Sequence, residues 1–214
     1  MIIKLKQQLV KTSLRLVEKG LVVATWGNLS IREEKKQVFV ITPSGMPYEK
    51  LNPEDMVTLD FKGNVLEGER KPSTETPLHL EIYKAREDVK AIIHTHSIFA
   101  SACAVSRVAI PPVIEDLASL VGGSVDIADY ALPGSEELAK NALKALGEKN
   151  AVLLANHGVI AVGPTVDEAF KTACLVEKAA CIFINAHLVG VPKVISKEDV
   201  KTLRNYYVNK YGQK

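Results

Sequence analysis

The sequence contains few cysteines, and they follow no recognisable pattern. Cys103, Cys174 and Cys181 are odd in number and form no C-x-x-C pair. A disulfide framework or a zinc knuckle requires paired thiols at regular spacing, so neither organises this fold. The three thiols instead predict reduced, packed side chains in a cytoplasmic protein.

An excess of one charge and long hydrophobic runs are also missing. The formal net charge is only +2, which argues against nucleic-acid binding through a broad basic face but still allows a local basic pocket for a small anion. The N-terminus alternates lysines with apolar residues, and no later run reaches the roughly 20 apolar residues of a membrane-spanning helix. Secretion and membrane insertion are both unsupported.

The remaining composition is that of an ordinary α/β protein. The chain has 214 residues, of which 47% are hydrophobic and 24% charged, and it shows no repeat or linker, so one domain over residues 1–214 is expected. Hydrophobic periodicity predicts alternating helices and short strands. The helices are expected over 2–19, 78–86, 97–105, 115–121, 135–146, 165–188 and 196–207, the strands over 21–24, 38–41, 89–93, 125–131, 151–154 and 159–162, and a hairpin within 51–71.

Two histidines close the predicted strand 89–93. His94 and His96 are separated by one residue, so their side chains point to the same face of the strand. Neutral imidazoles held at fixed spacing suit zinc or a similar divalent ion. The alternative is a pair of histidines that are hydrogen-bonded at a strand end. His157, in the turn between the last two predicted strands, would complete the three-ligand pattern of catalytic zinc.

Three turns are rich in glycine, hydroxyl groups and exposed backbone N–H groups. They centre on Gly27-Asn28, Ser44-Gly45 and Ser73-Thr74, and the third precedes a helix whose N-cap is expected at Thr76. Such turns can bind a phosphate, although each one alone is more often simply a turn. Glu75, beside the third turn, has the ordinary interpretation of complementing the helix dipole, and His79 is expected to be a packing or capping residue.

Five motifs together resemble the class II aldolase/epimerase family, in the same order and at similar spacing over nearly the whole chain. They are Gly27-Asn28-Leu29-Ser30, the segment Thr42 to Leu51, Pro72-Ser73-Thr74-Glu75, His94-Thr95-His96 and Asn156-His157-Gly158. The resemblance implies a three-layer α/β/α sandwich with a mainly antiparallel central sheet. It also implies one zinc ion per subunit and a cyclic homotetramer with active sites at the subunit interfaces.

The resemblance also implies roles for individual residues. His94, His96 and His157 would bind zinc, and Glu75 would complete the resting shell and then act as the acid/base. Tyr211 would reach the site of a neighbouring subunit as a further catalytic residue. Six residues would bind the substrate phosphate: Gly27, Asn28, Ser44, Gly45, Ser73 and Thr74.

The activity implied is cleavage of a (deoxy)ketose 1-phosphate, such as L-fuculose 1-phosphate, to dihydroxyacetone phosphate and an aldehyde such as lactaldehyde. Aldolases of this type have a tyrosine where this chain has Asp116, which leaves the proton donor to the aldehyde open. In having an aspartate at this position, the chain resembles the pentulose-phosphate 4-epimerases. Those enzymes have an aspartate at the position of Glu75, however, so the glutamate here favours the aldolase. The alternatives are 4-epimerisation or dehydration of a phosphorylated ketose such as methylthioribulose phosphate at the same metal site, or a non-enzymatic oligomeric module.

Overall fold

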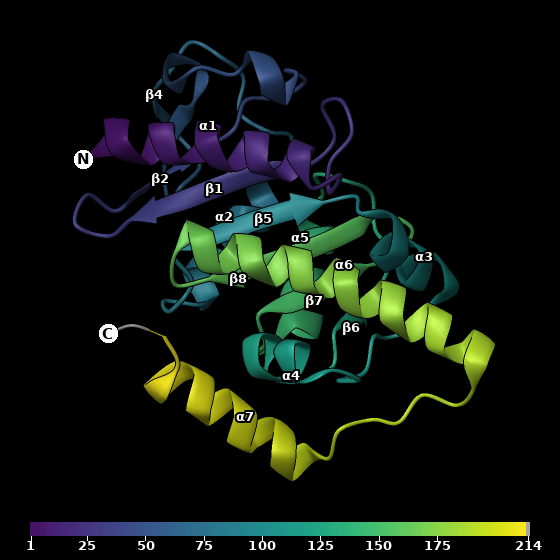
Figure 1. Cartoon of the computed structure of the whole chain (residues 1–214). Coiled ribbons are helices and arrows are strands. Elements are labelled where there is room, and N and C mark those ends of the chain that lie inside the picture. Colours follow the sequence, from purple (N-terminus) through teal and green to yellow (C-terminus); the bar gives the residue numbers. More distant parts are fainter. Residues whose placement is uncertain (213–214) are drawn as a thin grey trace.

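A single eight-stranded sheet forms the centre of the computed structural model, which describes residues 1–212 (Figure 1). The strand order across the sheet is β4-β3-β2-β1-β5-β8-β7-β6. The strands are β1 (Asn28–Glu33), β2 (Val38–Ile41), β3 (Val57–Asp60), β4 (Val65–Glu67), β5 (Ala91–Thr95), β6 (Asp126–Ala128), β7 (Ala151–Leu154) and β8 (Gly158–Gly163). Neighbouring strands run antiparallel except β6 and β7, which are parallel, so the sheet is mixed where the family resemblance implied a mainly antiparallel one.

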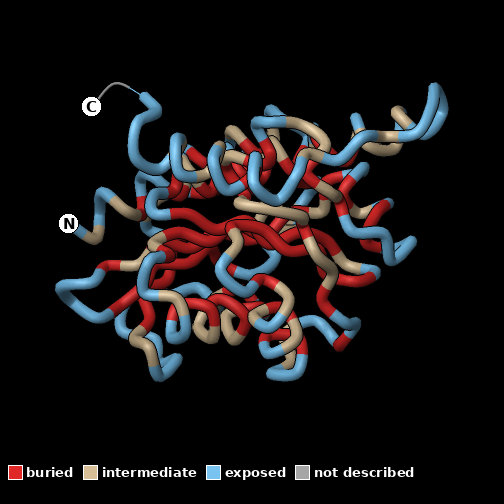
Figure 2. The backbone as a smooth tube through the Cα atoms, turned by 90° about the horizontal axis from the view of Figure 1, so that it is seen from below, coloured by how far each residue is buried: buried red, intermediate tan, exposed pale blue. Residues whose placement is uncertain are grey.

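Helices cover both faces of this sheet, which confirms the expected three-layer α/β/α sandwich. The helices α2 (Thr76–Ala85) and α5 (Glu136–Leu146) pack on one face. The other face is covered by α1 (Ile2–Glu18), α3 (Ile98–Ser106), α4 (Glu115–Val121) and α6 (Val166–Val189), and α7 (Lys197–Lys210) lies against α4. The buried backbone of the sheet therefore runs between two helical layers (Figure 2).

The side-chain alternation of the central strands explains why both faces are apolar. In β5, Ile92 belongs to the cluster beneath α2 and α5, whereas Ala91 and Ile93 belong to the cluster beneath α1 and α6. Period-two alternation in a strand that is buried on both sides gives a continuous apolar run. The same alternation turns His94 to the α2 side of the sheet.

Helix α6 is long and apolar enough to span a membrane by length and composition alone. The sequence analysis expected no such run. In the structure the predicted inner face of α6, which includes Ala169, Ala173, Val176 and Ala180, is buried against the sheet. One face of the helix therefore packs in the core, and 28% of its most apolar window is buried.

Local predictions differ from the structure in two places that matter for the site. Residues 21–24 form no strand, because Gly20 and Ala24 both adopt positive φ, and Leu21 and Val22 are buried as loop residues. The N-cap of helix α2 lies one residue earlier than predicted, at Glu75 and not at Thr76. The Thr76 hydroxyl donates to the Ser73 carbonyl, so it does not cap the helix.

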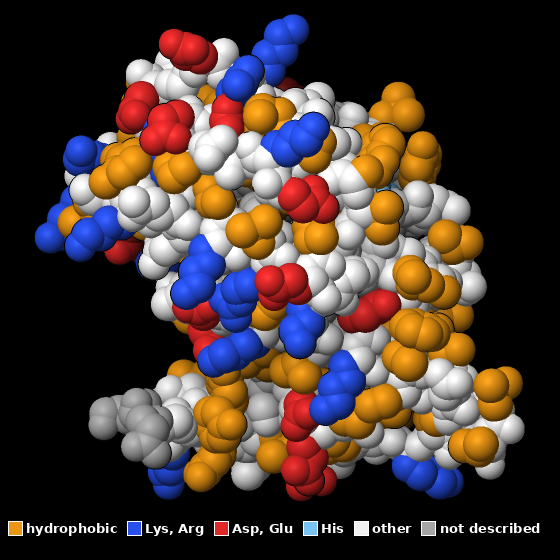
Figure 3. Space-filling model, turned by 45° about the horizontal axis from the view of Figure 1, so that its top comes forward, with side chains coloured by type: hydrophobic (Ala, Val, Ile, Leu, Met, Phe, Trp, Pro, Cys, Tyr) orange, Lys and Arg blue, Asp and Glu red, His pale blue; other side chains and the backbone are white. Residues whose placement is uncertain are grey.

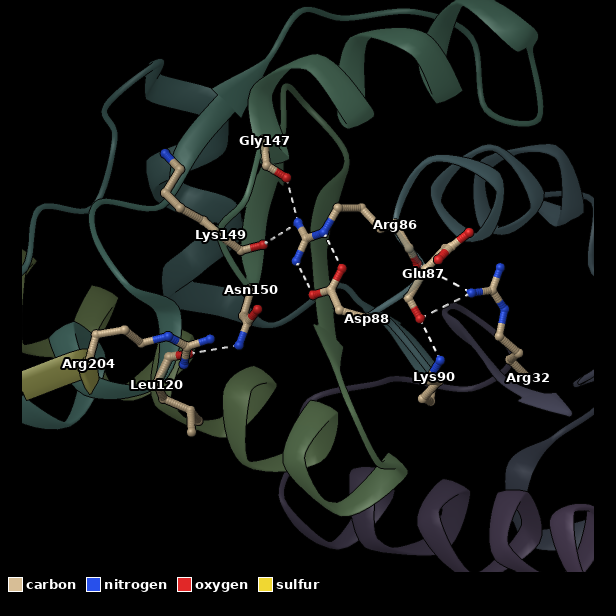
Figure 4. Close-up of polar contacts among 10 residues, drawn as sticks. All are labelled: Arg32, Arg86, Glu87, Asp88, Lys90, Leu120, Gly147, Lys149, Asn150 and Arg204. Carbon is tan, nitrogen blue, oxygen red and sulfur yellow. Dashed lines mark hydrogen bonds and ion pairs between the residues drawn. The ribbon is translucent and has the colours of Figure 1, made fainter. Parts of the chain in front are cut away.

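A polar network fixes the loops at the end of the sheet from which β5 starts (Figure 4). The Arg86 guanidinium binds the Asp88 carboxylate and donates to the carbonyls of Gly147 and Lys149. On the same side, the Arg204 guanidinium donates to the Leu120 carbonyl at 2.6 Å, which ties α7 to α4. The histidines lie at the opposite end of β5, so this network supports the framework and does not belong to the site.

Candidate metal centre and active site

His94 and His96 lie at the C-terminal end of β5 and face each other as the alternation predicts. Their Nε2 atoms are 2.8 Å apart, and the ring centroids are separated by 4.7 Å. His94 is fully buried, and its Nδ1 lies 2.9 Å from the Val159 carbonyl oxygen. Because a carbonyl only accepts, Nδ1 carries the proton and Nε2 is the acceptor nitrogen of the neutral ring.

His157 enters from the β7–β8 turn and completes a cluster of three imidazoles. Its ring centroid lies 4.7 Å from that of His94 and 5.0 Å from that of His96. One ring nitrogen from each histidine lies within 4.8 Å of the other two. The approach depends on Gly158, where a Cβ atom would lie 2.3 Å from the Thr95 carbonyl oxygen and 3.1 Å from atoms of both His94 and His96.

Burial keeps the three rings neutral. Desolvation lowers the pKa of His94 to about 4, and the hydrogen bond to Val159 opposes this shift only in part. Desolvation, together with the neighbouring His94 ring, also lowers the pKa values of His96 and His157 to about 4. At neutral pH all three are neutral imidazoles, which is the form that binds a metal ion.

Glu75 adds a buried carboxylate to this cluster. Its Oε2 lies 3.1 Å from His94 Nε2, and its Oε1 lies 3.5 Å from His157 Nε2. The lone pair on His94 Nε2 therefore faces a carboxylate oxygen, so two acceptors are in contact. Oε1 of Glu75 is buried and has no hydrogen-bond partner. A cation would relieve both conditions, and a set of three imidazoles and one carboxylate suits zinc or a similar divalent ion.

A cavity of about 300 Å³ opens beside the cluster. The structure brings the three predicted turns together around it, although they are far apart in the sequence. Its lining residues are Thr25, Trp26, Gly27, Asn28, Pro43, Ser44, Gly45, Ser73, Thr74, Glu75, His96, Pro133 and His157. All six predicted phosphate residues are therefore in one place, next to the histidines and Glu75.

Backbone N–H groups give this cavity its capacity for an anion. Among residues 1–212, the Ser44 N–H donates to the Lys71 carbonyl, and the Ser73 N–H donates to the Thr42 carbonyl. Those of Gly27, Gly45 and Thr74 donate to no protein acceptor in the same part of the chain. Convergent free N–H groups beside a helix N-terminus form the kind of concavity that binds phosphate.

Two residues near the site have a role that the sequence analysis did not predict. The Asn28 amide donates to Glu75 Oε2 at 2.8 Å, and its Oδ1 lies 2.5 Å from Nε2 of the fully buried His79. His79 was expected to be a packing or capping residue, but it is hydrogen-bonded within the site. The available signal was the spacing of Glu75, His79 and Tyr83, which places them on one stripe of α2.

Asp116 and Tyr211 do not line this cavity in the single chain. Both line a different cavity, of about 610 Å³, between α1, α4, α6 and α7. The Tyr211 ring stacks on Tyr207 with centroids 5.1 Å apart and is 61% exposed. The Asp116 carboxylate forms an ion pair with Lys178 at 2.6 Å.

Comparisons with known proteins agree with the fold and the site. Residues 7–184 match the family described as the Class II Aldolase and Adducin N-terminal domain. The chain belongs to this family and is a class II aldolase.

Among its relatives is a 5-deoxy-D-ribulose 1-phosphate aldolase of Bacillus thuringiensis serovar kurstaki, which is 36% identical over 98% of each chain. The L-fuculose phosphate aldolase of Escherichia coli K12 is 33% identical over 92% of this chain and 91% of its own length. A solved structure of an L-fuculose 1-phosphate aldolase superposes with a TM-score of 0.93 at 40% identity, covering 96% of both chains.

Proposed function

We propose that this protein is a zinc-dependent aldolase that cleaves a deoxyketose 1-phosphate to dihydroxyacetone phosphate and an aldehyde. The observation that carries this proposal is the convergence of three neutral imidazoles and the Glu75 carboxylate beside a cavity with free backbone N–H groups. The names of the relatives, a deoxyribulose phosphate aldolase and a fuculose phosphate aldolase, support the same substrate class.

His94, His96 and His157 would hold the ion, with Glu75 as the fourth ligand of the resting site. A bound divalent cation supplies positive charge to the oxygens of the enediolate that forms when the carbon–carbon bond breaks, a stabilisation of several kcal/mol. Among residues 1–212, no lysine lines the cavity. A Schiff base, the alternative way to stabilise that charge, would need a lysine amine at the cavity.

Glu75 would move the protons. In the cleavage direction its carboxylate accepts the proton of the C4 hydroxyl, the C4 aldehyde forms, and the C3–C4 bond breaks with its electron pair passing into the ketone. The same carboxyl group then returns a proton to C3. Oε1 suits this role because it has no hydrogen-bond partner and belongs to a residue that lines the cavity.

The three turns would bind the phosphate of the substrate. The free N–H groups of Gly27, Gly45 and Thr74 and the hydroxyls of Ser44 and Ser73 offer neutral donors. Neutral donors suit a site in which a divalent cation already supplies positive charge. Asn28 lies in the same group, but its side-chain amide is engaged by Glu75 and His79.

Apolar surface at the same cavity suits the deoxygenated end of the substrate. Trp26 is 64% exposed, and its indole centroid lies 6.0 Å from the His96 ring. Pro133 adds a second apolar residue to the lining. A methyl-bearing aldehyde such as acetaldehyde or lactaldehyde would contact this surface as it leaves.

The proposed assembly is a homotetramer in the cytoplasm, with the single catalytic domain of residues 1–214 as its subunit. Orange side chains gather along the right-hand edge of the surface in Figure 3, the side on which Figure 1 draws α3 and the end of α6. Exposed apolar residues there include Ile98, Val105 and Val189, and such a patch is typical of an interface. Tyr211 does not line the cavity of its own chain, so the catalytic role proposed for it requires the site of another subunit. Light scattering after gel filtration would measure the number of subunits.

The deciding experiment is a screen of ketose 1-phosphates with zinc-loaded protein, in which dihydroxyacetone phosphate is measured with a coupled dehydrogenase. We expect release of this product with 5-deoxyribulose 1-phosphate or fuculose 1-phosphate, and no release by the His94→Ala variant. Conversion of the sugar without dihydroxyacetone phosphate would refute aldol cleavage and leave 4-epimerisation or dehydration. No conversion of any substrate, with metal bound, would favour a non-enzymatic module.

A further inference from the structure

A ladder of polar side chains crosses the buried interface between β1 and α2. Along β1, Asn28 and Ser30 project toward α2, and along α2, Glu75, His79 and Tyr83 project toward β1. Two residues of a strand advance by about 6.6 Å and four residues of a helix by about 6.0 Å. The two rows therefore stay in register, and each of the three inner side chains, Asn28, His79 and Ser30, lies between two partners of the other row.

The ladder is continuous from Tyr83 to Glu75. The Tyr83 hydroxyl lies 2.7 Å from Ser30 Oγ, which lies 2.6 Å from His79 Nδ1. His79 Nε2 lies 2.5 Å from Asn28 Oδ1, and the Asn28 amide donates to Glu75 Oε2 at 2.8 Å. Ser30, His79 and Tyr83 are completely buried.

The carboxylate at the end of the ladder sets the direction of every hydrogen bond in it. An ionised Glu75 only accepts, so Asn28 must turn its NH₂ group to Glu75 and its Oδ1 to His79. His79 Nε2 must then carry a proton, and Nδ1 of the neutral ring must accept one from Ser30. The Ser30 oxygen in turn accepts from the Tyr83 hydroxyl.

Burial of this many polar groups in an apolar interface is costly unless all are satisfied. Among the described residues, every side-chain nitrogen and oxygen of the ladder has a partner except Glu75 Oε1. The ladder thus holds Oε2 of Glu75 through the Asn28 amide, and Oε1 is left for the site. A purely structural network would have no reason to end on a single unsatisfied atom of a residue that lines the cavity.

We propose that His79, supported by Ser30 and Tyr83, is a positioning residue that orients the Asn28 amide and through it the Glu75 carboxylate. This inference rests on the proposed function, since Glu75 is the acid/base there. His79 fixes Asn28 so that only NH₂ meets Oε2, and this directs Oε1 to the substrate proton. Loss of His79 should lower kcat and leave KM nearly unchanged, because His79 neither binds the metal nor contacts the phosphate.

The kinetic test compares His79→Leu with His79→Gln. Removal of a residue that orients a ligand typically costs ~10–100-fold, so we expect His79→Leu to lower kcat by that factor while KM and bound zinc change little. Gln offers an N–H near the position of Nε2, so His79→Gln should recover most of the loss. Ile82→Val, on the same buried face of α2, is the control for packing, and it should leave kcat unchanged.

Two further hydroxyl variants keep the test decisive if His79→Leu does not fold. Ser30→Ala should lower kcat, and Tyr83→Phe should lower it less because it removes only the outermost donor. Ser13→Ala is the matched control, since the Ser13 hydroxyl is equally buried and has no partner. Equal kcat for Ser30→Ala and Ser13→Ala would overturn the proposal.

A direct measurement does not depend on the reaction. Long-range ¹H–¹⁵N spectra of the metal-free protein, with the His79 signals assigned from His79→Gln, should show the neutral Nε2–H tautomer. An Nδ1–H tautomer or an imidazolium at neutral pH would overturn the proposed orientation even if the protein is an active aldolase. The expected tautomer in a protein inactive on every ketose 1-phosphate would instead uphold the orientation and refute the proposed function.

Discussion

Gly158→Ala should dismantle the metal centre without unfolding the protein. The added Cβ would lie 2.3 Å from the Thr95 carbonyl oxygen, so β5 and the β7–β8 turn must separate by roughly 1 Å to restore normal contact. The same atom would lie 3.1 Å from both the His94 and His96 rings. Metal sites tolerate ligand displacements of only about 0.2 Å, so the loss of metal affinity should exceed the loss of stability.

Overpacking of this kind costs about 1–3 kcal/mol, which a folded domain of this size withstands. We expect zinc affinity to fall at least about 10–100-fold, the range seen when the support of a ligand is removed, and turnover to fall with it. Competition titration with a chromogenic chelator measures the affinity, and urea unfolding measures the stability.

Gly163→Ala is the matched control at the far end of β8. Its Cβ would lie 2.7 Å from the Ala169 backbone nitrogen, so it should lose similar stability by separating β8 from α6 while keeping its zinc. The reasoning would be refuted if Gly158→Ala bound zinc as tightly as the unmodified protein. It would also be refuted if both variants lost zinc equally.

Three further outcomes are expected. His94→Ala should lose bound metal and activity together but keep its far-UV circular dichroism, and full activity in a metal-free sample would contradict this. Burial lowers the pKa of His79 to about 3, so between pH 6.5 and about 3 only the unfolded state binds this proton. His79 should therefore contribute about 1.4 kcal/mol per pH unit to the fall in the free energy of unfolding as the pH falls, beside the contributions of His94, His96 and His157. Urea titrations of the metal-free His79→Gln variant should show a shallower loss, and an equal slope would be the negative result. Deletion of residues 211–214 should lower turnover more than metal content, and an unaltered rate would rule out the role of Tyr211.

Local patterns in the sequence were sufficient to predict most elements and to indicate His94, His96 and His157 as candidate metal ligands. His94 and His96 are adjacent on one face of a strand, so their convergence follows from strand geometry alone. The three-layer arrangement required the family resemblance, because strand pairing between distant segments leaves no local signal. The 21–24 segment failed as a strand prediction since positive φ at Ala24 is imposed by the fold.

The polar ladder was missed for a different physical reason. His79 was interpreted as a packing or capping residue, and the polarity of Ser30 and Tyr83 gave no sign of a shared network. Only the register of β1 against α2 turns them inward and brings them into contact. The positions of Asp116 and Tyr211 in a separate cavity likewise depend on how α4 and α7 pack, which no pattern within either helix encodes.

The pairing of β5 with β8 has a consequence for biosynthesis. His94 and His157 meet only after the intervening segment, from α3 to β7, has been translated and β8 has docked on β5. In the proposed zinc site, the third imidazole would therefore join the other two only after β8 has docked on β5. Added zinc should slow unfolding while leaving the refolding rate unchanged, since the ion stabilises only the completed native state.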